Sequence, residues 1–422
     1  KVVREYYFND HGEQINRFAK SLVAAWAEAN NLGEAGYQTE TPCDGYKGAY
    51  INEIAARVQA EAESDGVDLT ALAHQDQGLN DDGEPLGEAD TEVREEFRKR
   101  AVPMMFDEIQ KSMKDFRVNF DVWFHENSLY ADGKVDAAIE ELKSRGDIFD
   151  KDGATWFEST KHGDDKDRVI IKSNGEFAYF AADIAYHRNK LEQRGFSKAI
   201  NIWGADHHGH VARLQAALDG LGLDGSHRLI IVLMQLVNLL QDGQPVRMSK
   251  RSGKAIALRD LLDEVSVDAA RFFFNSRSST SALDFDLDLA VREDSENPVY
   301  YVQYAHARIC SLIARLAEEG HLVPDAAAVD PALYATAEEK ALIKTLSQLP
   351  EVIRLAARDY DPSGVNRYLV TLAGEFHRFY NACRIKGEEA AVLAARLKLA
   401  DTVRAVIANC LALIGVAAPE KM

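Results

Sequence analysis

The chain has 422 residues, 46% of them hydrophobic, so it is long enough for two or three domains with their own cores. Its formal charge of −19 is unfavourable for nucleic-acid binding, and no apolar run approaches the roughly 18 residues that a membrane span needs. Four scattered cysteines without a Cys-x-x-Cys pair argue against a structural zinc site and indicate a reducing, cytoplasmic setting.

The negative charge is unevenly distributed along the chain. From Asn297 onward, 14 basic and 14 acidic residues balance, so the whole excess lies in residues 1–296. The acidic stretch 53–100 is expected to face solvent, whereas the C-terminal third is free to meet a polyanion. This balance permits nucleic-acid binding without demonstrating it.

The first part of the chain alternates short apolar runs with amphipathic segments, which predicts an α/β domain with a parallel sheet up to about residue 290. Residues 2–8 are predicted as a strand and residues 13–29 as a helix. Glycine, proline and acidic runs interrupt this alternation at 37–100, and turn sequences interrupt it at 124–175. We interpret both stretches as insertions.

After residue 175 the alternation of helices and strands resumes, and from residue 297 it gives way to helices alone. Residues 180–194 and 211–221 are predicted as helices, and 199–203 and 229–233 as strands. Residues 297–422 show helical periodicity without a convincing strand, which predicts an all-helical bundle.

A polar loop, Asp206-His207-His208-Gly209, lies between a predicted buried strand and a predicted helix. Ligands of open α/β sheets bind beyond the carboxyl ends of the strands, and helix N-termini attract phosphate. We therefore favour a nucleotide site here. A metal site built from the clustered imidazoles and a purely structural turn are the alternatives.

Tyr179 and Asp183 lie four residues apart at the start of a predicted helix, so both can face one cleft. A carboxylate pairs with a guanidinium, and a phenol adds one directed hydrogen bond. Taken alone, the pair is also consistent with a helix cap.

A basic loop follows the turn-prone Asp242-Gly243: Arg247-Met248-Ser249-Lys250-Arg251-Ser252-Gly253. Mobile cations on such a loop can follow charge as it moves between phosphates. The alternative is a solvated basic hairpin tip. The segment does not satisfy the Gly-x-x-x-x-Gly-Lys-[Ser/Thr] pattern, so a Walker A loop is excluded.

Aromatic and basic residues alternate on two helices of the C-terminal third, around Tyr301 and around Tyr380. Unstacked RNA bases are bound by aromatic stacking together with polar side chains. Most of these aromatics are explained by core packing, notably Phe376 and Phe379, whereas Tyr301 and Tyr380 are expected to reach solvent.

Taken together, these segments resemble bacterial-type arginyl-tRNA synthetase, a class I aminoacyl-tRNA synthetase, and Arg247 to Gly253 resembles its Lys-Met-Ser-Lys-Ser loop. The resemblance runs over nearly the whole chain, through residues 4–10, 44–51, 164–169, 183–187, 206–208, 247–253, 297–306 and 418–422. It implies a Rossmann-like catalytic domain at 1–240, a basic-loop and connecting region at 241–296, and a helical anticodon-binding domain at 297–422.

The resemblance also implies a reaction: ATP, accompanied by Mg²⁺, activates arginine, and the arginyl group passes to the terminal adenosine of tRNA(Arg). It further implies roles for individual residues. Arginine binds to Tyr179, Asp183 and His207; ATP binds to Asp206, His207, His208, Gly209 and Met248; Lys250, Arg247 and Ser249 are catalytic; and Tyr301, Ala305, Tyr380 and Met422 approach the anticodon. No protein metal site is implied.

One departure from the family is the His-x-Gly-His motif, which is not found on the first strand–helix turn. Its place is expected upstream of Lys1, so we expect an N-truncated chain with little activity alone. Two alternatives follow: a noncatalytic tRNA-binding module, and a class I enzyme for another amino acid.

Overall fold

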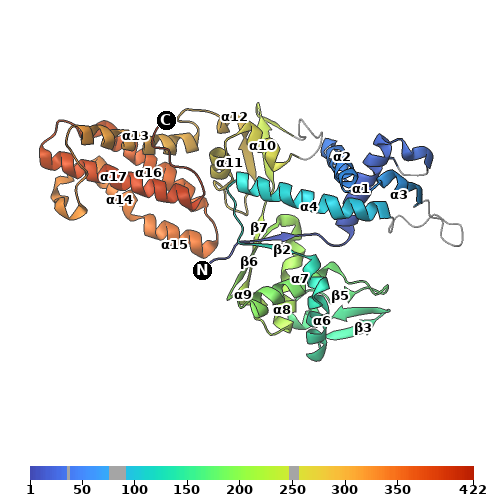
Figure 1. The fold of residues 1–422 in the computed structure, drawn as a ribbon. Coiled ribbons are helices and arrows are strands. Elements are labelled where there is room, and N and C mark those ends of the chain that lie inside the picture. Colours follow the sequence, from blue (N-terminus) through green and yellow to red (C-terminus); the bar gives the residue numbers. More distant parts are fainter. Residues whose placement is uncertain (36–38, 76–91, 247–255) are drawn as a thin grey trace. The chain divides into compact units, whose positions relative to one another are not determined.

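The computed structural model describes residues 1–35, 39–75, 92–246 and 256–422 (Figure 1). These residues form two compact units. Unit 1 contains Lys1–Ile231 and Ile256, and unit 2 contains residues 232–246 and Ala257–Met422. Among the described helices, none is both long and apolar enough to cross a membrane.

Unit 1 begins with a parallel pair of strands, β1 (Glu5–Phe8) and β2 (Val122–His125). Their register pairs Phe8 with His125, so the residues that follow both strands meet at one edge. Glu126 N donates to Phe8 O at 3.1 Å, and Asp10 accepts from Asn127 N at 2.9 Å. The ends of the two strands are therefore joined directly.

Between these strands lies a group of helices with a core of its own. The buried residues Phe18, Leu22 and Trp26 form one face of α1, which packs against α2 and α4. The bounds are α1 Glu13–Ala29, α2 Ala49–Ser64, α3 Leu69–Gln75, α4 Glu92–Asp115 and a 3-10 turn Leu32–Ala35. The described part of the stretch 37–100 is thus more regular than its glycine and proline content indicates, because Ile51, Ile54 and Val58 of α2 are buried at helical spacing.

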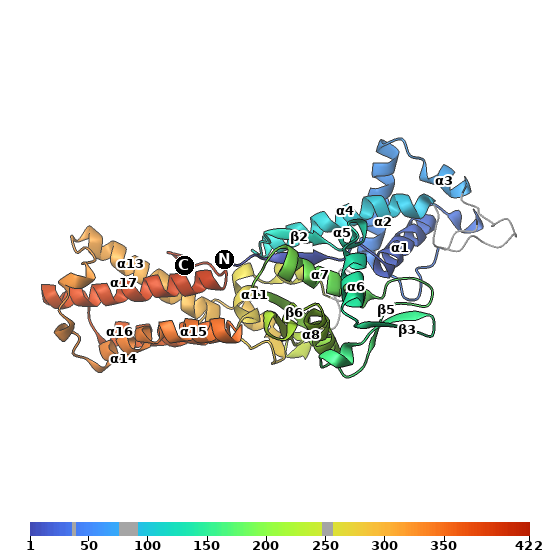
Figure 2. The ribbon, with the colours of Figure 1, turned by 90° about the horizontal axis from the view of Figure 1, so that it is seen from below.

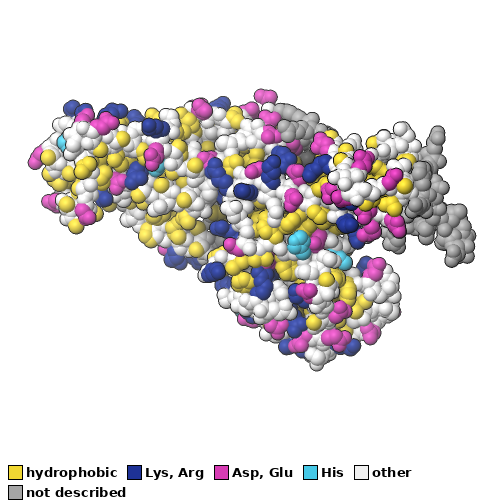
Figure 3. Space-filling view, viewed as in Figure 1, with side chains coloured by type: hydrophobic (Ala, Val, Ile, Leu, Met, Phe, Trp, Pro, Cys, Tyr) yellow, Lys and Arg dark blue, Asp and Glu magenta, His cyan; other side chains and the backbone are white. Residues whose placement is uncertain are grey.

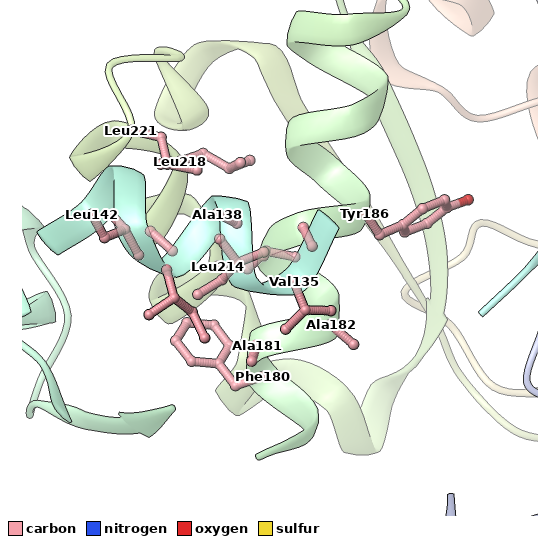
Figure 4. Packing of buried hydrophobic residues seen from close by; sticks show 14 of the residues in the cluster. Val135, Ala138, Leu142, Phe180, Ala181, Ala182, Tyr186, Leu214, Leu218 and Leu221 are labelled. Atoms are coloured by element: carbon pink, nitrogen blue, oxygen red, sulfur yellow. The ribbon is translucent and has the colours of Figure 1, made fainter. Parts of the chain in front are cut away.

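The second half of unit 1 surrounds another apolar core. Figure 4 shows Val135, Ala138 and Leu142 of one helix facing Leu214 and Leu218 of another. The elements are α5 Asn127–Ala131, α6 Lys134–Ser144, β3 Ile148–Lys151, β4 Ala154–Phe157, a 3-10 turn Ser159–His162, β5 Arg168–Ile171, α7 Tyr179–Arg188, a π-helical turn Asn189–Gln193, β6 Ala199–Gly204, a 3-10 turn Ala205–His210, α8 Val211–Gly220, α9 Gly225–Arg228 and β7 Leu229–Met234. Strands β3, β4 and β5 form an antiparallel sheet, and β6 pairs with β7.

Unit 2 opens with a small sheet in the order β10-β8-β9. Strand β8 (Val237–Gln241) pairs in parallel with β10 (Leu283–Asp286) and antiparallel with β9 (Gln244–Pro245). Helices α10 (Leu258–Glu264), α11 (Val267–Phe274) and α12 (Leu287–Ala290) accompany it.

The rest of unit 2 is a helical bundle, and no strand occurs in 297–422, all of which is described. Its helices are α13 Pro298–Glu318, α14 Ala337–Ser347, α15 Leu349–Asp359, α16 Ser363–Ala382 and α17 Ala390–Leu413, with 3-10 turns Ala326–Ala328 and Pro331–Leu333. Helices α13, α16 and α17 pack on one another (Figure 2). The C-terminal tail lies along α13, where Gln303 donates to Ala417 O at 2.9 Å.

Candidate functional site

Two buried or largely buried carboxylates lie together where β1, β2 and α7 converge. Glu126 follows β2 directly and is 5% exposed, and Asp183 lies on the second turn of α7. Burial raises the pKa of Glu126 to about 7, helped by the charges of Asp183 and Asp10 and opposed by a hydrogen bond from Tyr7. Burial also raises the pKa of Asp183 to about 6. Burial therefore disfavours the ionised form of each carboxylate, and a cation bound beside them would stabilise that form.

Tyrosines surround this pair of carboxylates. Burial and the charges of Glu126 and Asp183 raise the pKa of Tyr7, and the same causes raise that of Tyr130 to about 12. Tyr179 begins α7, is 62% exposed, and lies close enough to Tyr130 to affect its pKa. The arrangement places two buried or largely buried carboxylates next to tyrosine side chains, one of which, Tyr179, is exposed.

The structure brings together the predicted Tyr179 and Asp183, but the sequence reasoning missed Glu126 and Tyr7. An acidic residue directly after a strand was the available signal for Glu126. The sequence analysis contains no strand at residues 122–125, because turn sequences favour an insertion at 124–175.

Basic side chains lie near Asp183 and affect its pKa. Arg213 of α8, Lys190 of the π-helical turn and His207 each hold down the pKa of Asp183, against the larger effect of burial. Arg213 is itself pushed towards a lower pKa by burial and by Arg168. The predicted proximity of His207 to Asp183 is thus reflected in the electrostatics.

The Asp206-His207-His208-Gly209 loop is a 3-10 turn between β6 and α8, with exposed side chains at Asp206, His207 and His208. The His207 ring lies 6.0 Å from that of Trp203. Within the described residues, no group of three or more His, Cys, Asp or Glu side chains is arranged to hold a metal ion.

The letters His-x-Gly-His occur in this turn, at residues 207–210, and so on a later strand–helix turn of the chain. The first such turn, between β1 and α1, reads Asn-Asp-His-Gly at residues 9–12. Arg247, Met248, Ser249 and Lys250 lie outside the described residues, between β9 and α10.

A concave site lies in the helical bundle, between α13 and α16. It encloses about 270 Å³ and is lined by Ser295, Tyr300, Tyr301, Tyr304, Arg308, His377 and Asn381. The rings of Tyr304 and His377 are stacked with centroids 6.0 Å apart, and the Arg308 guanidinium lies 4.2 Å from the centroid of Tyr380. We call this the aromatic pocket.

One ring nitrogen of His377, a residue that lines the aromatic pocket, has no hydrogen-bond partner among the described residues. This atom, Nε2, is buried, and burial together with Arg308 lowers the pKa of His377, so the ring is neutral at pH 7. A neutral imidazole nitrogen can accept a hydrogen bond from a ligand.

The four predicted anticodon residues differ in how far their side chains are exposed to solvent. Tyr301 and Tyr380 are half-buried beside the aromatic pocket, and Met422 is exposed at the C-terminus. The side chain of Ala305 is fully buried in α13, and its role near the anticodon stays a prediction. Acidic and basic side chains are interspersed over the bundle on the face in Figure 3, in keeping with its balanced charge.

Two protein families match the sequence. Residues 85–292 match "tRNA synthetases class I (R), catalytic domain", and residues 302–422 match "DALR anticodon binding domain". The first match contains Glu126, Asp183 and the 206–209 loop. The second contains most of the aromatic pocket.

Relatives match the chain over its whole length. A protein of Bifidobacterium longum named arginine–tRNA ligase is 64% identical, the alignment covering 100% of this chain and 72% of the relative. A protein of the same name from Acetivibrio thermocellus is 47% identical, covering 100% and 71%.

Solved structures of aminoacyl-tRNA synthetases also resemble this chain. The putative arginyl-tRNA synthetase of Campylobacter jejuni superposes with a TM-score of 0.84 at 33% identity, covering 100% of this chain and 85% of the other. The arginyl-tRNA synthetase of Thermus thermophilus gives a TM-score of 0.73 at 19% identity, covering 100% and 76%, which is a likeness of fold. A methionyl-tRNA synthetase of Mycobacterium tuberculosis, solved with methionyl-adenylate, also shares the fold, with a TM-score of 0.57 at 13% identity over 98% of this chain and 91% of the other.

Proposed function

The chain belongs to the arginyl-tRNA synthetase family, and from this premise we propose that it activates arginine with ATP and transfers the arginyl group to the terminal adenosine of tRNA(Arg). The pair of carboxylates Glu126 and Asp183 carries the proposal. Two acceptors whose pKa values are raised by burial and, at Glu126, by the neighbouring charge of Asp183, form a site that a cation completes. A guanidinium supplies that charge in a planar, multidentate form.

In this proposal the guanidinium of arginine lies between Asp183 and Glu126, and Tyr179 adds a hydrogen bond at the exposed side. The Tyr7 hydroxyl, which donates to Glu126, orients that carboxylate. Lysine fits less well because its ammonium is a compact point charge and cannot bridge two carboxylates in one plane.

Arginine binding is expected to depend on pH in a defined direction. Asp183, with a pKa of about 6, and Glu126, with a pKa of about 7, are protonated at low pH and then offer no negative charge. Affinity for arginine should therefore rise between pH 5.5 and pH 8. Calorimetric titration across this range measures it, and a pH-independent affinity would contradict the assignment.

For activation, the arginine carboxylate attacks the α-phosphate of ATP and pyrophosphate leaves. We assign Asp206, His207, His208, Gly209 and Met248 to the nucleotide, with Mg²⁺ bound largely through the phosphates. Lys250, aided by Arg247 and Ser249, stabilises the negative charge that develops on the leaving pyrophosphate. Catalysis then consists of positioning and electrostatic stabilisation, without a protein nucleophile.

For tRNA, we propose that the aromatic pocket receives an unstacked base of the anticodon loop, beside Tyr301 and Tyr380, with Met422 near the same site. Tyr304 is 40% exposed and belongs to a group of stacked rings with Tyr300 and His377, a group that a base can join by stacking. We further propose the division into 1–240, 241–296 and 297–422 for catalysis, connection and anticodon binding, in a cytoplasmic protein.

Tyr304→Ala is expected to weaken tRNA(Arg) binding about tenfold, because stacking on one aromatic contributes about 1–3 kcal/mol. Filter binding or fluorescence anisotropy measures it. Leu322→Ala, which removes an exposed side chain from the loop after α13, is the control. Equal binding by wild type and Tyr304→Ala would remove the aromatic pocket from the tRNA interface.

Charging of tRNA(Arg) with radioactive arginine tests the whole proposal. Slow arginyl-tRNA formation that requires ATP and Mg²⁺ is the expected result, because the first strand–helix turn lacks the His-x-Gly-His motif. Saturable tRNA binding without charging would instead favour the noncatalytic tRNA-binding alternative for these 422 residues, and charging with another amino acid would refute the specificity.

A further inference from the structure

A row of polar side chains lies next to Asp183, between α7, the π-helical turn and β6. His187, four residues after Asp183 on α7, is 1% exposed, and Asn201 on β6 is 9% exposed. His187 Nδ1 lies 2.7 Å from Asp183 O, His187 Nε2 lies 2.6 Å from Asn201 Nδ2, and Lys190 Nζ lies 3.0 Å from Asn201 Oδ1. Three side chains thus connect the ammonium of Lys190 to the backbone of Asp183.

The Lys190 ammonium at one end of this row and the Asp183 carbonyl at the other determine which atom donates in every hydrogen bond. The Lys190 ammonium can only donate, so Asn201 must turn its Oδ1 to it and its amide N–H towards His187. The Asp183 carbonyl can only accept, so His187 must carry its proton on Nδ1 and accept at Nε2. The Asn201 orientation that Lys190 requires and the His187 tautomer that the Asp183 carbonyl requires are compatible, since Asn201 then donates to His187 Nε2.

We propose that Lys190, Asn201 and His187 are positioning residues for arginine recognition, forming a one-way hydrogen-bond relay that fixes the Asp183 turn of α7 against β6. The proposal rests on the proposed function, since it needs Asp183 to bind the guanidinium. None of the three side chains is required to touch arginine.

The electrostatics of the row support this arrangement. Burial and the charge of Lys190 lower the pKa of His187, so the imidazole is neutral and has a single N–H to place. Burial lowers the pKa of Lys190 to about 8, and its ammonium lies 4.1 Å from the centroid of the Tyr186 ring. Lys190 therefore has two possible roles, through its hydrogen bond to Asn201 and through its charge on Asp183, and an experiment must separate them.

A pair of variants with the same length and no charge makes the separation. Lys190→Met removes both the charge and the donor, whereas Lys190→Gln removes the charge but keeps an N–H for Asn201. If the relay positions Asp183, arginine affinity should fall about tenfold or more in Lys190→Met, because small misplacements of a binding group are costly. Lys190→Gln should recover most of this loss. Equal losses in both variants would overturn the relay and leave only a charge effect.

The His187 tautomer supplies a second test that does not depend on how well a variant folds. Nitrogen-15 NMR of histidine-labelled wild-type protein should show His187 neutral with its proton on Nδ1, and a proton on Nε2 would refute the relay. Failure of the proposed function is recognised separately, as absence of arginine binding by the wild type. Lys172→Met, at an exposed lysine of the same unit, is the control and should bind arginine normally.

Discussion

Replacing Asp183 by asparagine is expected to weaken arginine binding by roughly two to three orders of magnitude. Removing one charge from a buried, hydrogen-bonded pair costs about 3–5 kcal/mol, and each 1.4 kcal/mol is tenfold in affinity. Glu126 remains in the variant and limits the loss. Calorimetric titration with arginine measures it, and Asp136→Asn, at an exposed aspartate of α6, is the matched control.

The same variant should be no less stable than the wild type at pH 8. Burial raises the pKa of Asp183 from 3.8 to about 6, so the folded state binds its proton more tightly than the unfolded state does. The ionised carboxylate therefore destabilises the fold above pH 6, and this cost disappears with asparagine. Lost affinity in a stable variant would identify Asp183 as a binding group. Lost affinity with a collapsed melting temperature would mean that Asp183 acts through the fold.

Arg396→Met is expected to lower the free energy of unfolding by about 3–5 kcal/mol, because it leaves a buried carboxylate without its partner. Glu339 is 0% exposed, and Arg396 donates to it through Nε at 2.7 Å. The pair joins α14 to α17 in the bundle that contains the aromatic pocket. Urea denaturation followed by circular dichroism measures the effect, with the unfolding of the two units analysed separately.

The bundle provides its own control for this prediction. Arg354 pairs with Glu351 at 2.6 Å, but both side chains are more than half exposed, so Arg354→Met should lower the free energy of unfolding far less than Arg396→Met does. Burial alone would raise the pKa of Glu339, yet hydrogen bonds from Arg396 and Thr336 lower it. The stabilisation is thus present at pH 7 and lost as the pH falls below 4.5. Equal effects of the two substitutions would show that burial does not decide the strength of these pairs.

The sequence predicted those parts of the fold in which local pattern and burial agree. The helix at residues 13–29 and the strand at 199–203 were predicted nearly to their ends, since each has an apolar face with the right period. Helix α2 was missed because glycine and proline around it suggested a loop. The glycine and proline residues that flank α2 favour a loop, although the apolar residues within α2 have regular helical spacing.

The site was predictable where its residues lie close together in sequence. Tyr179 and Asp183 are one helical turn apart, so their shared face follows from the spacing. Glu126 reaches Asp183 only because β2 and α5 pack against α7, where the ring centroids of Phe124 and Tyr186 lie 4.7 Å apart. Local sequence spacing does not predict this tertiary contact. The burial of Ala305 does not follow from sequence either: helical periodicity gives the faces of α13, but the packing of α16 and α17 decides which face is buried.

The most direct test of arginine recognition is a comparison of arginine with citrulline, binding to the wild-type protein at pH 8. Citrulline has nearly the same shape, but a neutral urea replaces the guanidinium, so Glu126 and Asp183 would face each other without a cation. We predict saturable binding of arginine and binding of citrulline at least a hundredfold weaker, about 3 kcal/mol. Equal affinity for the two ligands would contradict the carboxylate-pair site and the function built on it.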